Sequence, residues 1–427
     1  MRLFRVEPCQ TRRNFPNPLP CGTISGVIEL EEAVQRILAV MPASARERVP
    51  LAAAHERVLS ERLLAALDLP SFDNSAMDGY AVCATDVAAA TLESPVGLRL
   101  RGRVAAGETF AAELSTGDGV RLFTGSPLPR GADAVVMQED TRTDPTNAER
   151  VLICDSVKPL ENVRLRGTDV KSGAVVAEAG EALTVGRIGL LAATGVMEVS
   201  VGKQPRVGLL ATGSELREAG QTLSPGQIYE SNRLTLAELV RRAGGLPKVH
   251  PLVPDKPDAT RQALEIALAE SDVVVTSGGV SVGEMDFVKA GFEALGGELQ
   301  FWKVAIRPGK PFVFGRWREK FLFGLPGNPV SAFVTFLLLV RPALRRWQGA
   351  NDVALPVQSG VLVEPLVNAG ERRHFMRVRV DAAGKVFSAG AQASHALFSL
   401  AAASGLMDVP PRTTITVGKT VAVIRWT

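Results

Sequence analysis

Strand-length apolar runs alternate with helical segments over residues 205–350, and this alternation constrains the fold more than any other feature. Each helical segment has apolar residues at helical spacing, and the last one is opened by Pro329. Strands that alternate with helices are typical of a parallel α/β sheet. The strand-like runs cover 207–212, 249–254 and 272–279, and the helical segments cover 229–245, 257–270, 287–295 and 329–347.

The flanking segments predict a multidomain protein of the α/β plus β class. Short Val- and Leu-rich runs broken by Gly, Pro and Asp predict a β domain over 69–165, and strand-like runs predict another over 351–427. Helical patterns over 24–68, including a second helix over 51–67, are followed by helix and turn signals over 166–204. We therefore expect a discontinuous helical linker domain into which the first β domain is inserted.

Composition excludes several classes of protein. The chain has 427 residues with 48 Lys and Arg against 45 Asp and Glu, a net charge of +3, whereas proteins that coat nucleic acid usually need a strongly basic face. Its four cysteines lack metal-binding spacing, and no apolar run is long enough to cross a bilayer. We expect a cytoplasmic protein that binds neither nucleic acid nor membranes, with a flexible Pro- and Arg-rich tail over 1–23.

Three strands of the α/β segment end in glycine-rich loops. Glycine lets backbone N–H groups approach an anion closely, and a helix N-terminus favours negative charge. Because the carboxyl ends of parallel strands meet at one edge of a sheet, these loops predict a phosphate- or oxyanion-binding crevice. For any one loop, the alternative is that its glycines only turn the chain. The candidate ligands are Gly213, Ser277, Gly278, Gly279, Ser281, Gly327, Asn328 and Ser331.

Charged side chains follow the same strand ends. Glu215, Asp255 and Asp286 would lie at the rim, where carboxylates beside phosphate-binding loops usually recruit Mg²⁺. A solvated loop acid is the alternative for each, and for Asp255 the two alternatives are about equally favoured. Lys303 and Arg307, with Lys310 in the same segment, could neutralise an anionic substrate, or they could decorate a surface strand edge.

The segment LPSFDNSAMDGYAV, residues 69–82, is the most distinctive in the chain. Two acids, an Asn, two hydroxyl side chains and a tight Met-Asp-Gly turn lie within a few residues, and an apolar strand follows. Taken alone, Asp78 before Gly79 is best explained as a turn cap. The segment matches no P-loop, nucleophile elbow or dinucleotide-binding fingerprint.

Six blocks occur in a characteristic order: PSFDNSAMDGYAV, LFTGSPLPRGADAVVMQE, NVRLRGTDV, SGGVSVGEMDF, RPGKPFVFG and GLPGNPVSAF. With them, the sequence over roughly residues 24–427 resembles the molybdopterin molybdenumtransferases, which insert molybdate during molybdenum cofactor synthesis and are related to the E domain of gephyrin. The resemblance implies four domains: a three-layer α/β molybdopterin-binding domain, an inserted β domain, a helical linker domain and a C-terminal β-barrel-like domain.

The resemblance also implies an elongated homodimer whose active site is shared between subunits. Asp78, Thr124 and Asp169 of one subunit would complete the crevice of the other, which holds the three rim acids. Pro326 and Pro329 would shape its loop. Four further residues match positions that help to hold molybdate or the substrate: Arg372, Arg377, Ser394 and Ser399.

The implied reaction uses adenylylated molybdopterin, molybdate and Mg²⁺, and it releases AMP and the mature cofactor. Glu215 and Asp286 are the expected metal or water ligands, and Lys303, Arg307, Ser331 and Arg372 are the candidates for molybdate. Contacts with the adenylylating enzyme and with apo-molybdoenzymes are also implied. Ser214 departs from the family, which often has Asp there, and Arg307 stands where Lys is also common.

Two rival functions belong to other classes. Adenylyltransferase chemistry would need only the α/β domain, so the additional domains and the DNSAMDGYAV block argue against it. A scaffold or receptor-binding role, as in gephyrin, is made less favourable by the intact set of acids.

Overall fold

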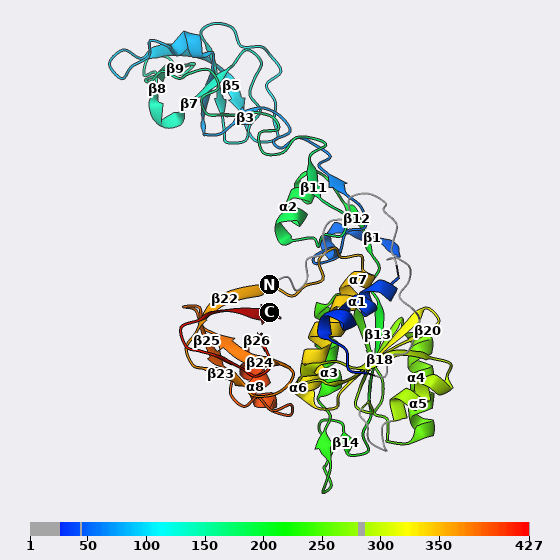
Figure 1. Cartoon of the computed structure of the whole chain (residues 1–427). Coiled ribbons are helices and arrows are strands. Elements are labelled where there is room, and N and C mark those ends of the chain that lie inside the picture. Colours follow the sequence, from blue (N-terminus) through cyan, green and yellow to red (C-terminus); the bar gives the residue numbers. More distant parts are fainter. Residues whose placement is uncertain (1–25, 43–44, 281–286, 427) are drawn as a thin grey trace, which may run out of the picture.

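A six-stranded mixed sheet forms the centre of the computed structural model, which describes residues 26–42, 45–280 and 287–426 (Figure 1). The four strands β16, β13, β17 and β21 are parallel, as the alternation predicts, although β16 lies at 246–249 and not over the predicted 249–254. Strand β20 is antiparallel to both of its neighbours. The sheet is therefore not wholly parallel, because a hairpin joins β20 to β21 with Arg318 at φ 55°. In sheet order the strands are β16 (Leu246–Val249), β13 (Arg206–Ala211), β17 (Val273–Ser277), β21 (Lys320–Leu325), β20 (Pro311–Trp317) and β18 (Glu298–Lys303).

Helices cover both faces of this sheet and make three layers (Figure 1). A cluster of phenylalanines lies under the first group of helices, and Phe292 and Leu264 fill the other side. The expected helix over 329–347 has a π-helical middle, because Pro342 cannot donate the hydrogen bond that a regular α-helix requires. On one face lie α1 (Leu30–Val40), α3 (Asn232–Arg242), α6 (Pro329–Thr335), the π-helix η4 (Phe336–Val340) and α7 (Arg341–Trp347), and on the other lie α4 (Pro257–Glu270) and α5 (Phe287–Ala294).

The linker region between the sheet and the inserted domain contains both strands and a helix. The second helix predicted over 51–67 is wrong: only a 3₁₀ turn forms, and Val58 and Leu59 instead make β-bridges to residues far along the chain. These tertiary pairings override the local helix propensity. The elements are β1 (Arg46–Pro50) paired with β12 (Glu198–Gly202), η1 (Leu51–Ala53), β2 (Leu63–Leu64) paired with β11 (Val175–Ala177), and α2 (Val185–Ala193).

The inserted β domain lies at the far end of the elongated chain (Figure 1). Its sheet buries separate small cores on its two faces, around Val136 and around Val120. The sheet order is β7 (Ala134–Met137), β4 (Gly79–Val82), β6 (Asp118–Leu122), β5 (Val96–Val104), β9 (Arg150–Ile153) and β8 (Thr141–Thr143). Beside it lie β3 (Asn74–Ser75) paired with β10 (Val163–Arg164), η2 (Ala84–Val87) and η3 (Gln138–Asp140).

The C-terminal domain is a closed five-stranded barrel, as predicted. Pairing of β24 with β26 closes it, and β19 (Ile306–Arg307) of the α/β domain adds a parallel edge to β24. The barrel is thereby attached beside the carboxyl ends of the central strands. Its elements are β22 (Val357–Leu362), β24 (Arg373–Val380), β25 (Lys385–Ser388), β26 (Gly405–Val409) and β28 (Thr420–Arg425), with β23 (Leu366–Asn368), β27 (Thr413–Ile415) and α8 (Leu397–Ala402) outside.

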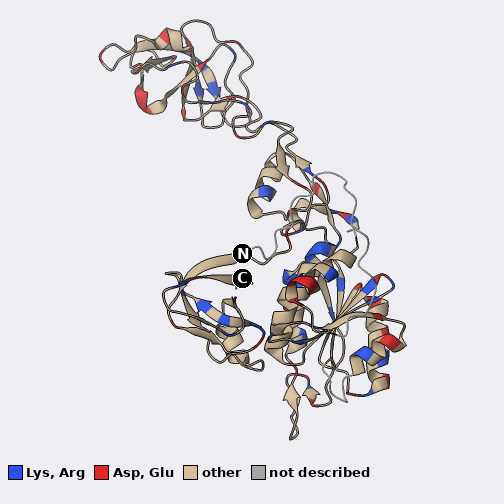
Figure 2. Ribbon diagram, in the orientation of Figure 1, with Lys and Arg blue, Asp and Glu red and all other residues tan. Residues whose placement is uncertain are grey.

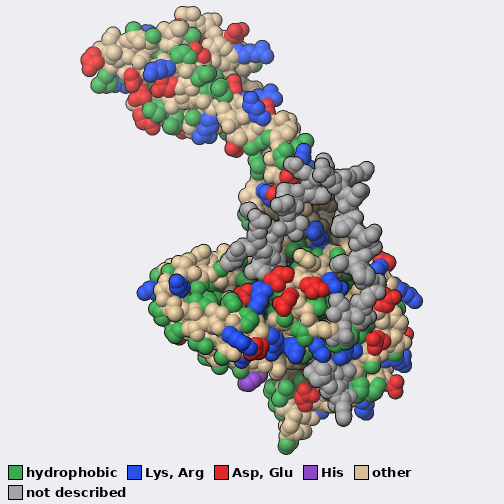
Figure 3. Space-filling model, viewed as in Figure 1, with side chains coloured by type: hydrophobic (Ala, Val, Ile, Leu, Met, Phe, Trp, Pro, Cys, Tyr) green, Lys and Arg blue, Asp and Glu red, His purple; other side chains and the backbone are tan. Residues whose placement is uncertain are grey.

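Charged side chains are spread over all of these parts (Figure 2). On the face drawn in Figure 3, acidic and basic side chains lie close together along the boundary between the barrel and the α/β domain. Within the described ranges, no helix is long and apolar enough to span a membrane.

Candidate active site

A polar cavity of about 760 Å³ lies where the α/β domain meets the barrel. Its walls come from three sources: the loops after the central strands, the turn that follows β19, and a loop of the barrel that precedes α8. The lining residues of the α/β domain are Thr212, Gly213, Glu215, Asp255, 278–280, 307–311, 326–328 and Ser331, and those of the barrel are Arg372 and 392–395.

Most of the site residues predicted from the sequence meet in this cavity. Five others do not line it: Ser277, Lys303, Pro329, Arg377 and Ser399. The residues that do line it are Gly213, Glu215, Asp255, Gly278, Gly279, Arg307, Pro326, Gly327, Asn328, Ser331, Arg372 and Ser394.

Two groups of predicted residues lie elsewhere. Ser281 and Asp286 fall outside the described residues. Asp78, Thr124 and Asp169 belong to the inserted domain or its junction, and none of them lines the cavity within one chain. Sequence reasoning did not select Gln392 and His395, although the resemblance did select Ser394 of the same loop.

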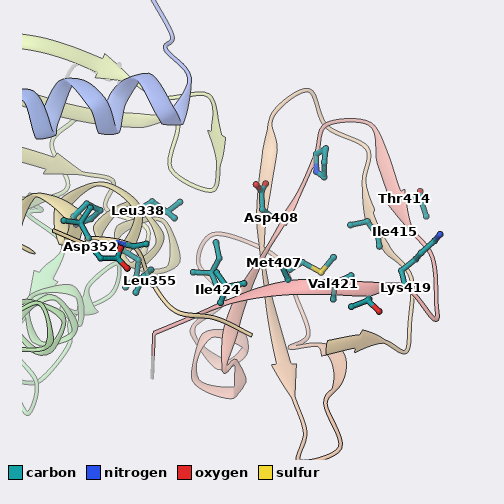
Figure 4. Close-up of a pocket in the computed structure, with 18 of the residues that line it drawn as sticks. Leu338, Asp352, Leu355, Met407, Asp408, Thr414, Ile415, Lys419, Val421 and Ile424 are labelled. Carbon is teal, nitrogen blue, oxygen red and sulfur yellow. The ribbon is translucent and has the colours of Figure 1, made fainter. Parts of the chain in front are cut away.

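A second cavity, of about 890 Å³, lies between η4, the connection to the barrel, and strands β26 to β28 (Figure 4). Its lining is mainly apolar and contains no residue predicted for the site. Asp352, Asp408 and Lys419 are its charged side chains, and Asp408 is already paired with Arg373. The larger cavity therefore lacks the polar groups that the smaller one brings together.

The glycine-rich loops are held together by one side chain that sequence reasoning missed. Asn232, the first residue of α3, donates hydrogen bonds from Nδ2 to Ser277 Oγ and to the carbonyl oxygen of Gly327, both at 2.7 Å. It thereby joins the end of β17 to the loop after β21, and Ser277, only 2% exposed, supports the loop from behind. An Asn at the start of a helix that follows a strand was the available signal.

Gly278 is required by both its backbone angle and its surroundings. Its φ is +91°, and a Cβ there would lie 2.7 Å from the carbonyl oxygen of Thr212. We expect Gly278→Ala to lower kcat/KM about tenfold. The added Cβ would shift the loop, and its backbone amides would leave the position in which they bind a ligand. Steady-state rates of the reaction catalysed at this site test this expectation. Gly226→Ala is the matched control, because Gly226 has φ +86° but open space around it; equal losses in both variants would contradict the expectation.

The acidic side of the cavity contains Glu215 and Asp255. Ser214 fixes Asp255 by a reciprocal pair of bonds: its backbone N–H donates to Asp255 Oδ2 at 3.0 Å, and its Oγ accepts from the Asp255 N–H at 3.0 Å. Ser214 thus orients Asp255 without adding negative charge. Among the described residues, Glu215 has no side-chain hydrogen bond and no group of three metal-ligating side chains forms.

These two carboxylates suit Mg²⁺ better than a transition metal. Mg²⁺ prefers oxygen ligands and is usually held by one or two carboxylates together with substrate phosphates and water. Glu215 and Asp255 supply such oxygens next to the glycine-rich loops. The donor set therefore fits a magnesium ion that binds together with a phosphorylated substrate.

The opposite side of the cavity is basic. Arg307, Lys310 and Arg372 line it, and Arg372 Nη1 donates to the carbonyl oxygen of Ile306 at 2.8 Å. Burial, followed by repulsion from Arg307, lowers the pKa of Arg372. No carboxylate on this side, within the described ranges, neutralises these groups. The arrangement favours a bound anion.

Buried behind this basic side is His374, which is 2% exposed and has no hydrogen-bond partner for either ring nitrogen among the described residues. Burial, reinforced by repulsion from Arg307, Arg377 and Arg372, lowers its pKa to about 4. The imidazole is therefore neutral at pH 7.

His374 is expected to make stability depend on pH. Its pKa is lower in the folded chain than in the unfolded chain, so the unfolded chain binds more protons below about pH 6.5. Between pH 7 and pH 5 the free energy of unfolding should fall by about 2 kcal/mol through this residue. Urea unfolding at both pH values measures the fall. His374→Leu should remove it and His395→Gln, at an exposed site, should not; an unchanged fall in His374→Leu would contradict the assignment.

A second polar cluster lies in the inserted domain. Asp78 Oδ1 accepts hydrogen bonds from the backbone N–H of Thr124 at 2.7 Å and from its hydroxyl at 2.8 Å. These two bonds, the backbone one first, hold the pKa of Asp78 below its usual value. Asp78 and Thr124 therefore form one exposed, ionised unit. Exposed Asp169 lies at the junction of the domain, where its N–H donates to the carbonyl oxygen of Leu69.

Comparison with family models covers almost all of the chain. Residues 28–195 match the MoeA N-terminal region (domain I and II), 208–346 match a probable molybdopterin binding domain, and 359–426 match the MoeA C-terminal region (domain IV).

Individual proteins show the same similarity. The chain is 38% identical to a molybdopterin molybdenumtransferase of Haemophilus influenzae, over 93% of this chain and 98% of that protein. It is 40% identical to molybdopterin molybdenumtransferase 2 of Mycobacterium tuberculosis, over 88% and 94%. The crystal structure of the molybdopterin biosynthesis moeA protein from Pyrococcus horikoshii OT3 aligns with a TM-score of 0.80 at 30% identity, over 94% of this chain and all of that one.

Proposed function

Because the chain belongs to the molybdopterin molybdenumtransferase family, enzymes of molybdenum cofactor biosynthesis, we propose that it inserts molybdenum from molybdate into adenylylated molybdopterin and releases AMP. The lining of the cavity is the observation that supports the proposed substrates. The cavity has a carboxylate side and an uncompensated basic side, with glycine-rich loops between them. Such a cavity suits a phosphorylated substrate and a second oxyanion together.

The basic side is assigned to molybdate. Molybdate is a tetrahedral dianion, and it needs several cationic and hydroxyl donors when it leaves water. Arg307, Lys310 and Arg372 supply charge, and Ser331 and Ser394 supply hydroxyl groups. Lys303 is withdrawn from this set because it does not line the cavity.

The carboxylate side is assigned to Mg²⁺ and the phosphates of the substrate. Glu215 and Asp255 would hold the ion, and it would supply charge neutralisation for the phosphoanhydride. The backbone N–H of Gly279 would bind a phosphate oxygen, whereas the N–H of Gly278 donates to the carbonyl oxygen of Leu325 at 3.0 Å and holds the loop in place. Hydrolysis of the phosphoanhydride consumes water and separates AMP from molybdopterin. The two dithiolene thiols then give their protons to one oxo group of molybdate, which leaves as water while two molybdenum–sulfur bonds form next to the basic side. Asp286, which lies outside the described residues, stays a candidate for the same ion.

The complete active site is proposed to form between two copies of the chain. Asp78, Thr124 and Asp169 lie away from the cavity in one chain, and a second copy would bring the two carboxylates and the hydroxyl group to it. Exposed apolar side chains flank both halves: Phe72 and Met77 beside Asp78, and Leu397 and the 89%-exposed Phe398 beside Ser394. Such residues are typical of an interface.

The remaining partners follow from this reaction. We place the protein in the cytoplasm, where it receives its substrate from the adenylylating enzyme and delivers the cofactor to apo-molybdoenzymes. A protein that only adenylylates molybdopterin would not need the basic side of the cavity, and a pure scaffold would need neither side.

Molybdate-dependent release of AMP tests the proposed function. Purified protein is incubated with adenylylated molybdopterin, with and without Mg²⁺ and molybdate, and AMP is quantified by chromatography. We expect AMP only when both ions are present. AMP release that does not depend on molybdate, or no AMP release at all, would refute the proposal. Asp255→Asn should reduce the rate and raise the Mg²⁺ concentration required, whereas Asp258→Asn, an exposed acid at the start of α4, should do neither.

A further inference from the structure

Arg377 is a buried cation without a counterion. Its side chain is completely buried in strand β24, and among the described residues it makes no ion pair. Burial lowers its pKa, but guanidinium groups in proteins remain protonated at neutral pH. An uncompensated buried charge is costly, so its retention calls for a reason in the surrounding structure.

The guanidinium holds one loop through its carbonyl groups. Nη2 donates to the carbonyl oxygens of Ala391 at 2.6 Å and Ala393 at 3.1 Å. Nε donates to Ser399 Oγ at 2.9 Å, which ties the loop to helix α8. The side chain of Gln392 adds two bonds of 2.9 Å to the backbone of Arg377. The loop is therefore fixed along its length to β24.

Planar peptide geometry then determines where the neighbouring amides point. In a trans peptide the C=O and N–H bonds point in opposite directions, and neither of the two peptide bonds in question is cis. Since the carbonyls of Ala391 and Ala393 point at Arg377, the N–H groups of Gln392 and Ser394 point away from it. Both residues line the cavity and Arg377 does not, so the loop separates Arg377 from the cavity.

These two amides have no partner in the described parts of the chain. No backbone or side-chain acceptor lies within hydrogen-bonding distance of the N–H of Gln392 or of Ser394. Two free amides that are two residues apart and point the same way form a concave anion-binding surface. They lie on the same barrel wall as Arg372, where none of the described acids lies.

We propose that the backbone N–H groups of Gln392 and Ser394 bind an oxyanion in the cavity, and that Arg377 is the positioning residue that aims them. The inference rests on the function proposed above, with molybdate as the oxyanion. It assigns Arg377 and Ser399 a role behind the loop rather than direct contact with the substrate. The charge of Arg377 adds to the positive potential of the basic side.

Direct binding of molybdate to the free protein tests the inference apart from catalysis. In protein selectively labelled with ¹⁵N-glutamine, the amide signal of Gln392 should shift as molybdate is added, and Gln392→Ala identifies that signal by its loss. A Gln392 amide that does not shift while calorimetry registers molybdate binding would overturn the inference. Absence of all molybdate binding would instead refute the proposed function.

Variants of Arg377 test the positioning role. Arg377→Lys keeps the charge but replaces the planar fork with a single ammonium group, and we expect molybdate to bind at least about tenfold more weakly. The KM for adenylylated molybdopterin should stay within about twofold. Arg377→Met should weaken molybdate binding further if it folds, as judged by thermal unfolding.

Arg379 provides the matched control on the same strand. Its guanidinium lies over the ring of Phe387, 4.4 Å from the centroid, and does not reach the loop. Arg379→Met should bind molybdate normally. A folded Arg377→Lys protein with normal molybdate affinity, or one in which both KM values rise equally, would overturn the positioning role.

Discussion

Mixing a subunit that carries Asp78→Asn with one that carries Asp255→Asn is expected to restore activity above that of either variant alone. Each substitution impairs one half of the proposed site, and in the proposed dimer the two halves of an active site come from different subunits. In a heterodimer one site contains both defects and the other contains none. Random reassortment should therefore recover about a quarter of the wild-type rate. Rates of AMP release before and after co-denaturation and refolding, or from co-expressed tagged subunits, measure the recovery.

A second mixture serves as the control for this experiment. Asp255→Asn and Glu215→Gln both lie on the acidic side of the α/β cavity, so every dimer that they form carries a defect in each site. We expect no recovery from this pair. Recovery in both mixtures, or in neither, would contradict a site shared between subunits.

Removing the charge of Arg307 is expected to raise the KM for molybdate about a hundredfold, because charge-assisted hydrogen bonds in a partly buried cavity contribute a few kcal/mol. Arg307 lines the basic side and has no side-chain hydrogen bond within the described ranges, so Arg307→Gln should leave the fold intact. Initial rates over a range of molybdate concentrations, at saturating adenylylated molybdopterin, give the KM.

Lys303→Gln is the matched control, because Lys303 carries the same charge on the preceding strand but does not line the cavity. Its KM for molybdate should stay within about twofold. An effect as large as that of Arg307→Gln would place the oxyanion elsewhere.

The crevice itself was predictable because its residues follow successive strands. Gly213, Gly278 and Gly327 each follow a buried apolar strand, and parallel strands bring their carboxyl ends to one edge. The resemblance selected Ser394, but the sequence pattern itself could not show that the whole barrel loop over 392–395 faces these strand ends, because that contact depends on packing between domains. The resemblance to the family also did not distinguish an arginine that lines the cavity from one that supports a loop behind it, as with Arg372 and Arg377.

The structure separates these two arginines. Arg372 lies in the bend before β24, whereas Arg377 lies within the strand. One lines the cavity and the other is buried behind the loop. The wrong prediction of a helix over 51–67 has a different cause. Its pairing partners, including Val201, lie more than a hundred residues away, and local periodicity carries no information about them.

The most direct test of the account compares the molybdenum incorporated with the AMP released. Wild-type protein is incubated with adenylylated molybdopterin, Mg²⁺ and limiting molybdate, and the product is transferred to an apo-molybdoenzyme whose metal content is measured by mass spectrometry. The account predicts equimolar molybdenum and AMP, with an active acceptor enzyme. AMP released without incorporated molybdenum would contradict it.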